Sequence, residues 1–136
     1  QGDWSSDVCS SDLISDRLLH FCIADAANPP FPDGAFAWVH LGNVIDIADS
    51  GAGSILSAAA DLVQPGGLLT LSTPYDDDEM GLVGAAPPEE ELREAIEGLG
   101  LTIAGQEDQV PWVIREYDRG YRVLFSHCIA ARRDAR

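Results

Sequence analysis

Polar residues that could act on a substrate follow an apolar stretch of the sequence, residues 36–41. Asn43 comes directly after this stretch and its closing glycine, and Asp46 follows three residues later. An asparagine amide can orient a substrate through hydrogen bonds, and a carboxylate can take a proton from a reacting group. Asn and Asp are also ordinary loop residues. The pair therefore admits two interpretations, a site for proton transfer or a simple loop.

Two further side chains follow other apolar stretches in the same way. Asp25 comes after residues 18–23, and Tyr75 comes after residues 68–72. The carboxyl ends of parallel strands are where α/β folds bind ligands, so both residues are candidates for binding. The alternatives are a turn aspartate that caps its own loop and a tyrosine ring that packs on its loop.

The hydrophobic pattern predicts the elements that position these residues. Short apolar runs predict buried strands at Leu18–Ile23, Phe36–Leu41 and Leu68–Ser72. Apolar residues at helical spacing from Ile55 to Val63 predict a helix, and Pro65-Gly66-Gly67 is expected to end it and turn the chain.

The later part of the chain predicts a second helix and a hairpin. Prolines and acids at residues 87–91 favour a helix start, and Gly98 and Gly100 favour its end. Two long strands, about 101–116 and 121–131, are expected next, the first interrupted at Pro111. This alternation predicts an α/β domain with a mostly parallel sheet that ends in an antiparallel β-hairpin.

An ordered set of short motifs resembles the later half of class I S-adenosylmethionine (SAM)-dependent methyltransferases. The motifs are Ala24-Asp25-Ala26, the loop 30–36 with its Pro-Phe-Pro-Asp sequence, Asn43, and Pro65-Gly66-Gly67. The resemblance implies a Rossmann-like fold and SAM as cofactor. It implies that Asp25 and Ala26 contact the adenine and that Asn43 lies at the cofactor. Asn43 and Asp46 would then serve methyl transfer, and no metal is implied.

Three segments resemble a subgroup of that family, the methyltransferases of ovothiol-type synthesis that act on 4-mercaptohistidine. They are residues 43–46, 72–75 and 110–119. Thr73 departs from the subgroup's Ser-Pro-Tyr sequence, so the resemblance supports the subgroup rather than a substrate. It implies that Tyr75 closes over a small-molecule substrate.

Arg115 is the substrate-binding candidate in the last of these segments. A guanidinium group suits a substrate carboxylate, which it can hold through two hydrogen bonds. The alternative is an ion pair with Glu116 or Asp118 across the hairpin.

The first 13 residues are expected to be a non-native tail. Ten consecutive residues, Asp3–Asp12, match the translation of a common sequencing adapter. Residues 14–136 would then be the C-terminal portion of a methyltransferase domain. The family's Gly-rich loop and first two strands, which hold the methionine and ribose of SAM, are not found before Leu18, so we expect the chain to be inactive alone.

The absence of those strands has a consequence for the sheet. In the family's strand order, 3-2-1-4-5-7-6, Leu18–Ile23 belongs two places away from Phe36–Leu41. We expect it either to pair directly with Phe36–Leu41 or to detach while residues 36–131 keep their own pairing.

Composition excludes several classes of function. A formal net charge of −15, without a basic stripe, argues against nucleic acid as a partner. No apolar stretch is long enough for a membrane span, and no Cys-x-x-Cys or His-x-x-His spacing suggests a metal site. The expected compartment is the cytoplasm, and the sequence does not indicate an oligomeric state.

Three hypotheses therefore remain. The leading one is SAM-dependent methyl transfer to a small molecule. The alternatives are a non-catalytic Rossmann-like interaction domain and a fragment of a nicotinamide-dependent oxidoreductase. The sheet of such an oxidoreductase would end without the antiparallel hairpin, so the hairpin discriminates between the two enzymes.

Overall fold

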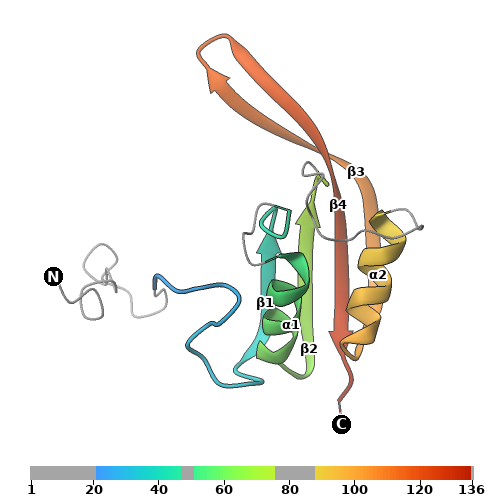
Figure 1. The fold of residues 1–136 in the computed structure, drawn as a ribbon. Coiled ribbons are helices and arrows are strands. Elements are labelled where there is room, and N and C mark those ends of the chain that lie inside the picture. Colours follow the sequence, from blue (N-terminus) through green and yellow to red (C-terminus); the bar gives the residue numbers. More distant parts are fainter. Residues whose placement is uncertain (1–20, 47–50, 76–87, 136) are drawn as a thin grey trace, which may run out of the picture.

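The structure, a computed structural model, describes residues 21–46, 51–75 and 88–135. Four strands and two helices are described there, and the strands form one sheet in the order β1-β2-β4-β3 (Figure 1). In chain order the elements are β1 (Phe36–Gly42), α1 (Ala52–Leu62), β2 (Val63–Thr73), α2 (Pro88–Gly98), β3 (Leu101–Tyr117) and β4 (Gly120–Arg133).

The direction of the strands differs from the sequence-based expectation. β1 and β2 are parallel, whereas β4 is antiparallel to both of its neighbours, β2 and β3. The prediction of a mostly parallel sheet is therefore wrong for the described strands, while the closing hairpin is confirmed. The reason is that α1 is the only described helix that connects two neighbouring strands, β1 and β2. After α2 the chain enters the far edge of the sheet as β3, and a tight turn returns it between β3 and β2.

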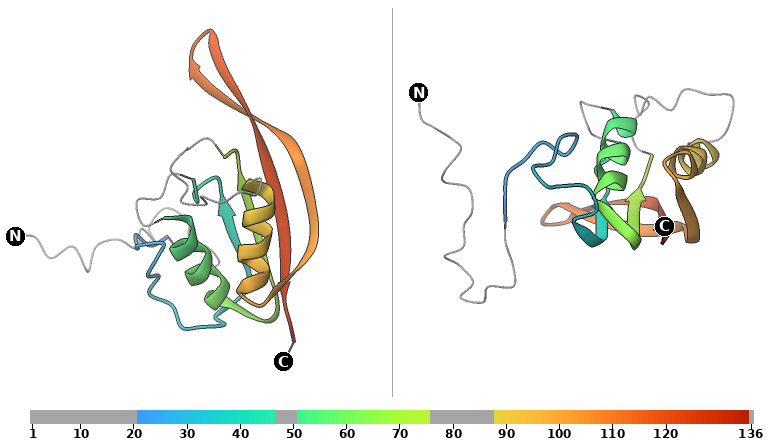
Figure 2. Two further views of the ribbon diagram at one scale, coloured as in Figure 1. Left: turned by 45° about the vertical axis from the view of Figure 1, so that its right-hand side comes forward. Right: turned by 90° about the horizontal axis from the view of Figure 1, so that it is seen from below.

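Both helices pack on one face of the sheet (Figure 2). The predicted stripe of α1 is confirmed, because Ile55, Leu56 and Ala59 are buried, and α2 buries Leu92 and Ile96. Alternate residues of β2 are buried against the helices, as expected for a strand with one covered face.

No described element covers the opposite face of the sheet. Trp38 and His40 lie there and share one partner: Thr70 Oγ1 accepts a hydrogen bond from Trp38 Nε1 at 2.8 Å and lies 2.9 Å from His40 Nδ1. Both side chains are exposed. They are exposed because their strand is covered on one face only within the described part.

The first predicted strand is not formed where the structure describes it. Residues 21–23 have no strand pairing, and Phe21 and Ile23 are 55% and 82% exposed. Residues 18–20 lie outside the described residues. The block from β1 to β4 keeps its own pairing, as in the second of the two expected outcomes. No described strand pairs with the outer edge of β1.

Pro111 does not interrupt β3, contrary to our prediction. It lies opposite Phe125 within a regularly paired stretch of β3 and β4, and the nearest register shifts fall on either side of it, between Glu107 and Val110 and between Arg115 and Tyr117. β3 is the edge strand, so a proline nitrogen that faces away from β4 removes no hydrogen bond from the sheet.

The hairpin extends well beyond the rest of the sheet (Figure 1). β2 pairs with β4 only as far as Thr73 and His127, while β3 and β4 continue together from Val110 and Ser126 to the turn after Tyr117. We call residues 110–126 the arm.

Candidate functional site

Asn43 and Tyr75 follow the carboxyl ends of two neighbouring strands, β1 and β2. We call this end of the sheet the rim. The register aligns Gly42 of β1 with Ser72 of β2, and the Asn43 N–H donates to the Ser72 carbonyl at 2.9 Å. Asn43 and Tyr75 have φ angles of 49° and 54°, in the left-handed region. Backbone in this region is costly for residues other than glycine, and such residues gather at functional sites.

β4 passes the rim and adds two side chains that the sequence analysis did not select. The Ser126 hydroxyl donates to Asn43 Oδ1 at 3.3 Å, and the Tyr75 hydroxyl lies 2.7 Å from His127 Nδ1. Ser126 and His127 are both buried. His127 lies within an apolar run of the sequence, which does not mark it as a functional residue. The only signal that could have found it is the strand register, which places His127 opposite Thr73.

Asp46 follows Asn43 by three residues and is buried. Its Oδ1 atom has no hydrogen-bond partner within the described part. A buried polar atom without a partner is rare and destabilising, and calls for an explanation such as an unoccupied binding role. The structure therefore brings Asn43 and Tyr75 to one rim and leaves a carboxyl oxygen of Asp46 free to accept a hydrogen bond or a proton.

The Tyr75 hydroxyl is held in its neutral form. Burial raises its pKa above the usual value for a tyrosine, and the negative charges of Glu89 and Asp108 raise it further. At neutral pH the group therefore keeps its proton. In the histidine tautomer that carries its proton on Nε2, Tyr75 donates to His127 Nδ1.

We expect Tyr75→Phe to lower the free energy of unfolding by about 1 kcal/mol, because His127 Nδ1 would lose its partner. A raised pKa in the folded state also means that ionisation of Tyr75 opposes folding. The contribution of Tyr75 to wild-type stability should thus be constant below pH ~10 and be lost as the pH rises above it, and the variant should show a shallower fall in that range. Urea unfolding at pH 7 and pH 10.5 checks this, with the exposed Tyr117→Phe as control. Equal stability of Tyr75→Phe and wild type at both pH values would contradict it.

Asp25 and Ala26 lie in an exposed loop. Asp25 Oδ1 accepts a hydrogen bond from the Ala27 N–H at 2.9 Å, and its carbonyl accepts one from the Asn28 N–H at 3.1 Å. This is the turn geometry that the alternative interpretation of Asp25 expected. The second carboxyl oxygen has no protein donor within the described part, so the turn does not preclude binding.

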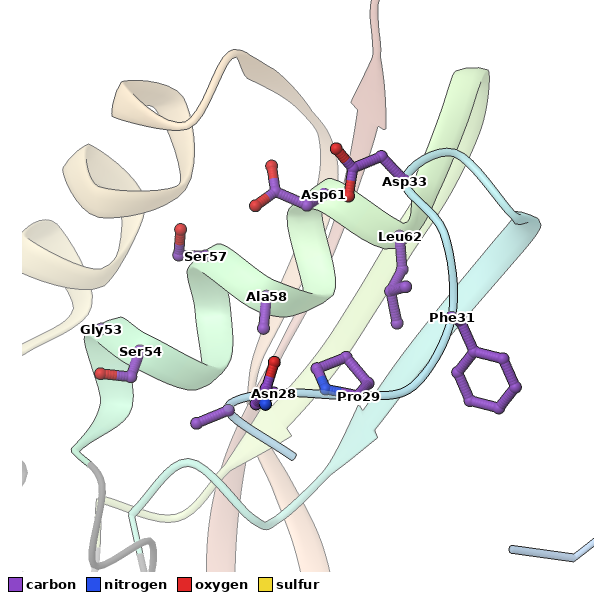
Figure 3. A pocket seen from close by; sticks show the side chains of 11 residues that line it. Asn28, Pro29, Phe31, Asp33, Gly53, Ser54, Ser57, Ala58, Asp61 and Leu62 are labelled. Carbon is purple, nitrogen blue, oxygen red and sulfur yellow. The ribbon is translucent and has the colours of Figure 1, made fainter. Parts of the chain in front are cut away.

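A groove of about 610 Å³ separates this loop from α1 (Figure 3). Asn28 lies beside Ala58 in the middle of the helix, Gly53 and Ser54 line the groove at the helix start, and Asp33 lies near Asp61 at the other end. The later part of the loop is fixed at the C-terminal end of α1, where the Gly34 N–H donates to the Asp61 carbonyl at 2.8 Å. The groove is within the size range of small-molecule sites.

Arg115 is not brought to the rim. It lies in the arm opposite Tyr121, with its guanidinium 2.9 Å from Asp118 Oδ1 and its side chain 58% exposed. Six residues of β4 separate Tyr121 from His127, which corresponds to roughly 20 Å along a strand. The ion pair with Asp118 is the alternative that the sequence left open for Arg115.

No group of three or more His, Cys, Asp or Glu side chains among the described residues could hold a metal ion. None of the helices described is long and apolar enough to cross a membrane.

Comparison with known proteins finds similarity only among solved structures. No protein-family model and no curated protein sequence matches the chain. The [4+2]-cyclase SpnF superposes with a TM-score of 0.58 at 14% identity, over 85% of this chain and 55% of SpnF. A SAM-dependent methyltransferase from Methanosarcina mazei gives 0.55 at 15% identity, over 83% of this chain and 66% of its own. A geranyl diphosphate methyltransferase gives 0.55 at 13% identity, over 81% and 51%.

The chain has the fold of SAM-dependent methyltransferases. It spans between about half and two thirds of the length of these three structures. Identities this low establish the fold and leave the activity open, and SpnF, named as a cyclase, illustrates that one fold serves several reactions.

Proposed function

We propose that the chain is the acceptor-side portion of a methyltransferase that transfers a methyl group from SAM to a small molecule, and that it is inactive alone. The observation that carries the proposal is the rim, where two residues with left-handed backbone and a tyrosine–histidine hydrogen bond lie at the ends of β1 and β2, with the buried Asp46 three residues after Asn43, its Oδ1 without a partner among the described residues. A domain that serves only for interaction does not require such a set. The antiparallel β4 between β2 and β3 disfavours the nicotinamide-dependent alternative.

The residues present fit one side of SAM. Asp25 keeps one carboxyl oxygen free of protein donors, which suits the amino group of adenine, and the exposed Ala26 N–H lies beside it in sequence. Asn43, at the end of β1, is the third residue proposed to lie at the cofactor. No described residue is assigned to the methionine moiety or the ribose. When bound, SAM supplies a methyl group on a positively charged sulfur.

The rim residues would align and deprotonate the acceptor. Because Asn43 Oδ1 accepts from Ser126, the amide N–H₂ of Asn43 remains available to hold a substrate oxygen or nitrogen. Asp46 would take the proton that the acceptor releases. Tyr75, fixed by His127, would cover the substrate. A mercaptohistidine-like acceptor, as the sequence resemblance implies, would have to place its carboxylate without Arg115 of the same chain.

SAM titration followed by amide NMR tests the cofactor assignment. We expect millimolar binding at best, since only the adenine side is held, with shifts at residues 25–28 and 43. Asp25→Ala should abolish those shifts, whereas Asp134→Ala, which removes an exposed carboxylate outside the loop and the groove, should preserve them. Unchanged shifts in Asp25→Ala would refute the adenine contact, and micromolar affinity of the wild type would refute the expected inactivity.

A further inference from the structure

The arm carries most of the exposed apolar side chains of the described chain. The described residues include eleven exposed large hydrophobic side chains. Six of the eleven belong to the arm: Trp112, Val113, Tyr117, Tyr121, Val123 and Phe125. Their exposed fractions range from 37% to 67%. Summed over both faces of the arm, they expose on the order of 600 Å² of apolar surface, which compares with the ~800 Å² that each partner contributes to a standard interface only if a partner contacts both faces.

Apolar residues line both faces of the arm. Paired residues of an antiparallel hairpin share a face, so Pro111 with Phe125 and Val113 with Val123 lie on one side. Trp112 and Leu124 lie on the other. A two-stranded ribbon with both faces toward water is only marginally stable, so an arm of this length and composition needs a partner surface.

The outer edges of the arm are also unpaired within the described part. β3 is the edge strand, and β4 has no β2 neighbour beyond His127. Free N–H and C=O groups along such edges favour pairing with another strand. A protein surface can satisfy these groups, whereas a lipid surface cannot.

The charge of the arm indicates which kind of protein surface would bind it. The arm contains three of the eight basic residues, Arg115, Arg119 and Arg122, and two of the 23 acidic residues, Glu116 and Asp118. It is therefore weakly basic, and the remainder of the chain carries the whole of the net negative charge. We call the remainder of the chain the body. The body of a second copy is an electrostatically favourable neighbour for the arm, while the bodies of two copies repel each other.

We propose that the arm is a dimerisation surface, in which the arms of two copies of this chain pack against each other and against the partner's body about a two-fold axis. This inference does not depend on the proposed function. It predicts a dimer at micromolar concentrations, with the arm ordered by the contact.

Sedimentation velocity over a concentration series tests the proposal. Val123→Glu places a charge in the apolar face of the arm and should weaken dimerisation at least tenfold. Ile23→Glu introduces the same charge at an exposed apolar residue outside the arm and should dimerise as the wild type does. Circular dichroism confirms that both variants fold.

Hydrogen exchange gives a second readout that does not rely on a variant. Amide protection at residues 110–126 should rise with protein concentration, while protection in α1 and β2 should not. The proposal is overturned by a wild type that stays monomeric to 1 mM, by concentration-independent protection of the arm, or by Val123→Glu dimerising normally, which would assign association to another surface. Co-sedimentation of a purely monomeric wild type with anionic vesicles would overturn it in favour of a lipid surface.

Discussion

Gly67→Ala is expected to lower the free energy of unfolding by about 1–3 kcal/mol. A Cβ at this position would lie 2.8 Å from the Gln64 carbonyl oxygen, 2.9 Å from that of Ala37 and 2.9 Å from Val63 Cγ1. Two of these three atoms belong to the backbone of paired strands, so they cannot rotate away as a side chain does. Relief requires β1 and β2 to move apart.

The surroundings of Gly67 explain why the effect should be large. β1 and β2 pair at Phe36 and Val63, lose their register, and resume at Trp38 and Leu68. Gly67 lies within this irregular segment, next to Gly66 with its φ of 79°. Separation of the strands here would propagate to the other end of the pair, where the Asn43 N–H meets the Ser72 carbonyl.

A matched control is available in α1. A Cβ at Gly53 meets no atom within 4 Å, and alanine favours the helix by roughly 0.5–1 kcal/mol over glycine. Urea unfolding should therefore show Gly53→Ala to be more stable than the wild type and Gly67→Ala to be less stable. Equal stability of Gly67→Ala and the wild type would show that the two strands yield without cost.

Local features of the fold were predictable from the sequence. The buried faces of α1 and α2 follow from helical spacing, as Leu56 and Leu92 show, since both are fully buried. The end of α2 follows from glycine chemistry, because Gly100 adopts a φ of 78°. These properties depend on residues a few positions apart, which a single sequence displays directly.

Properties set by distant pairing were not predictable. The direction of β4 depends on its insertion between β2 and β3, and the tolerance of Pro111 depends on β3 being an edge strand. Pro65-Gly66-Gly67 was expected between helix and strand, but the helix ends at Leu62 and β2 begins at Val63, so the glycines form an irregular start of β2 instead.

The residues of the candidate site also fall into those that the sequence could predict and those that it could not. Asn43 and Tyr75 were selected because each follows an apolar run, and the structure places both at the rim. His127 and Ser126 reach the same rim from a strand more than 50 residues later, through a register that no local pattern encodes. Arg115 was selected by resemblance alone, and the length of the arm separates it from the rim.

Asp46→Ala is expected to raise the free energy of unfolding by about 1–3 kcal/mol. The Asp46 side chain is almost fully buried, and its Oδ1 atom meets no donor among the described residues. Folding therefore removes a carboxyl oxygen from water with no compensating donor among the described residues, and alanine avoids that cost. A stabilising change at a proposed proton acceptor is the expected signature of a residue whose position serves a bound substrate rather than the fold.

The control for Asp46→Ala must remove the same charge from an exposed position. Asp134→Ala does so, since Asp134 is exposed near the end of β4, and its effect should stay within about 0.5 kcal/mol. The difference between the two variants in urea unfolding at pH 7 then isolates burial from the general relief of negative charge in a chain at −15. If Asp46→Ala is instead less stable than Asp134→Ala, the Asp46 carboxyl group supports the fold, and the argument that assigns it to a substrate fails.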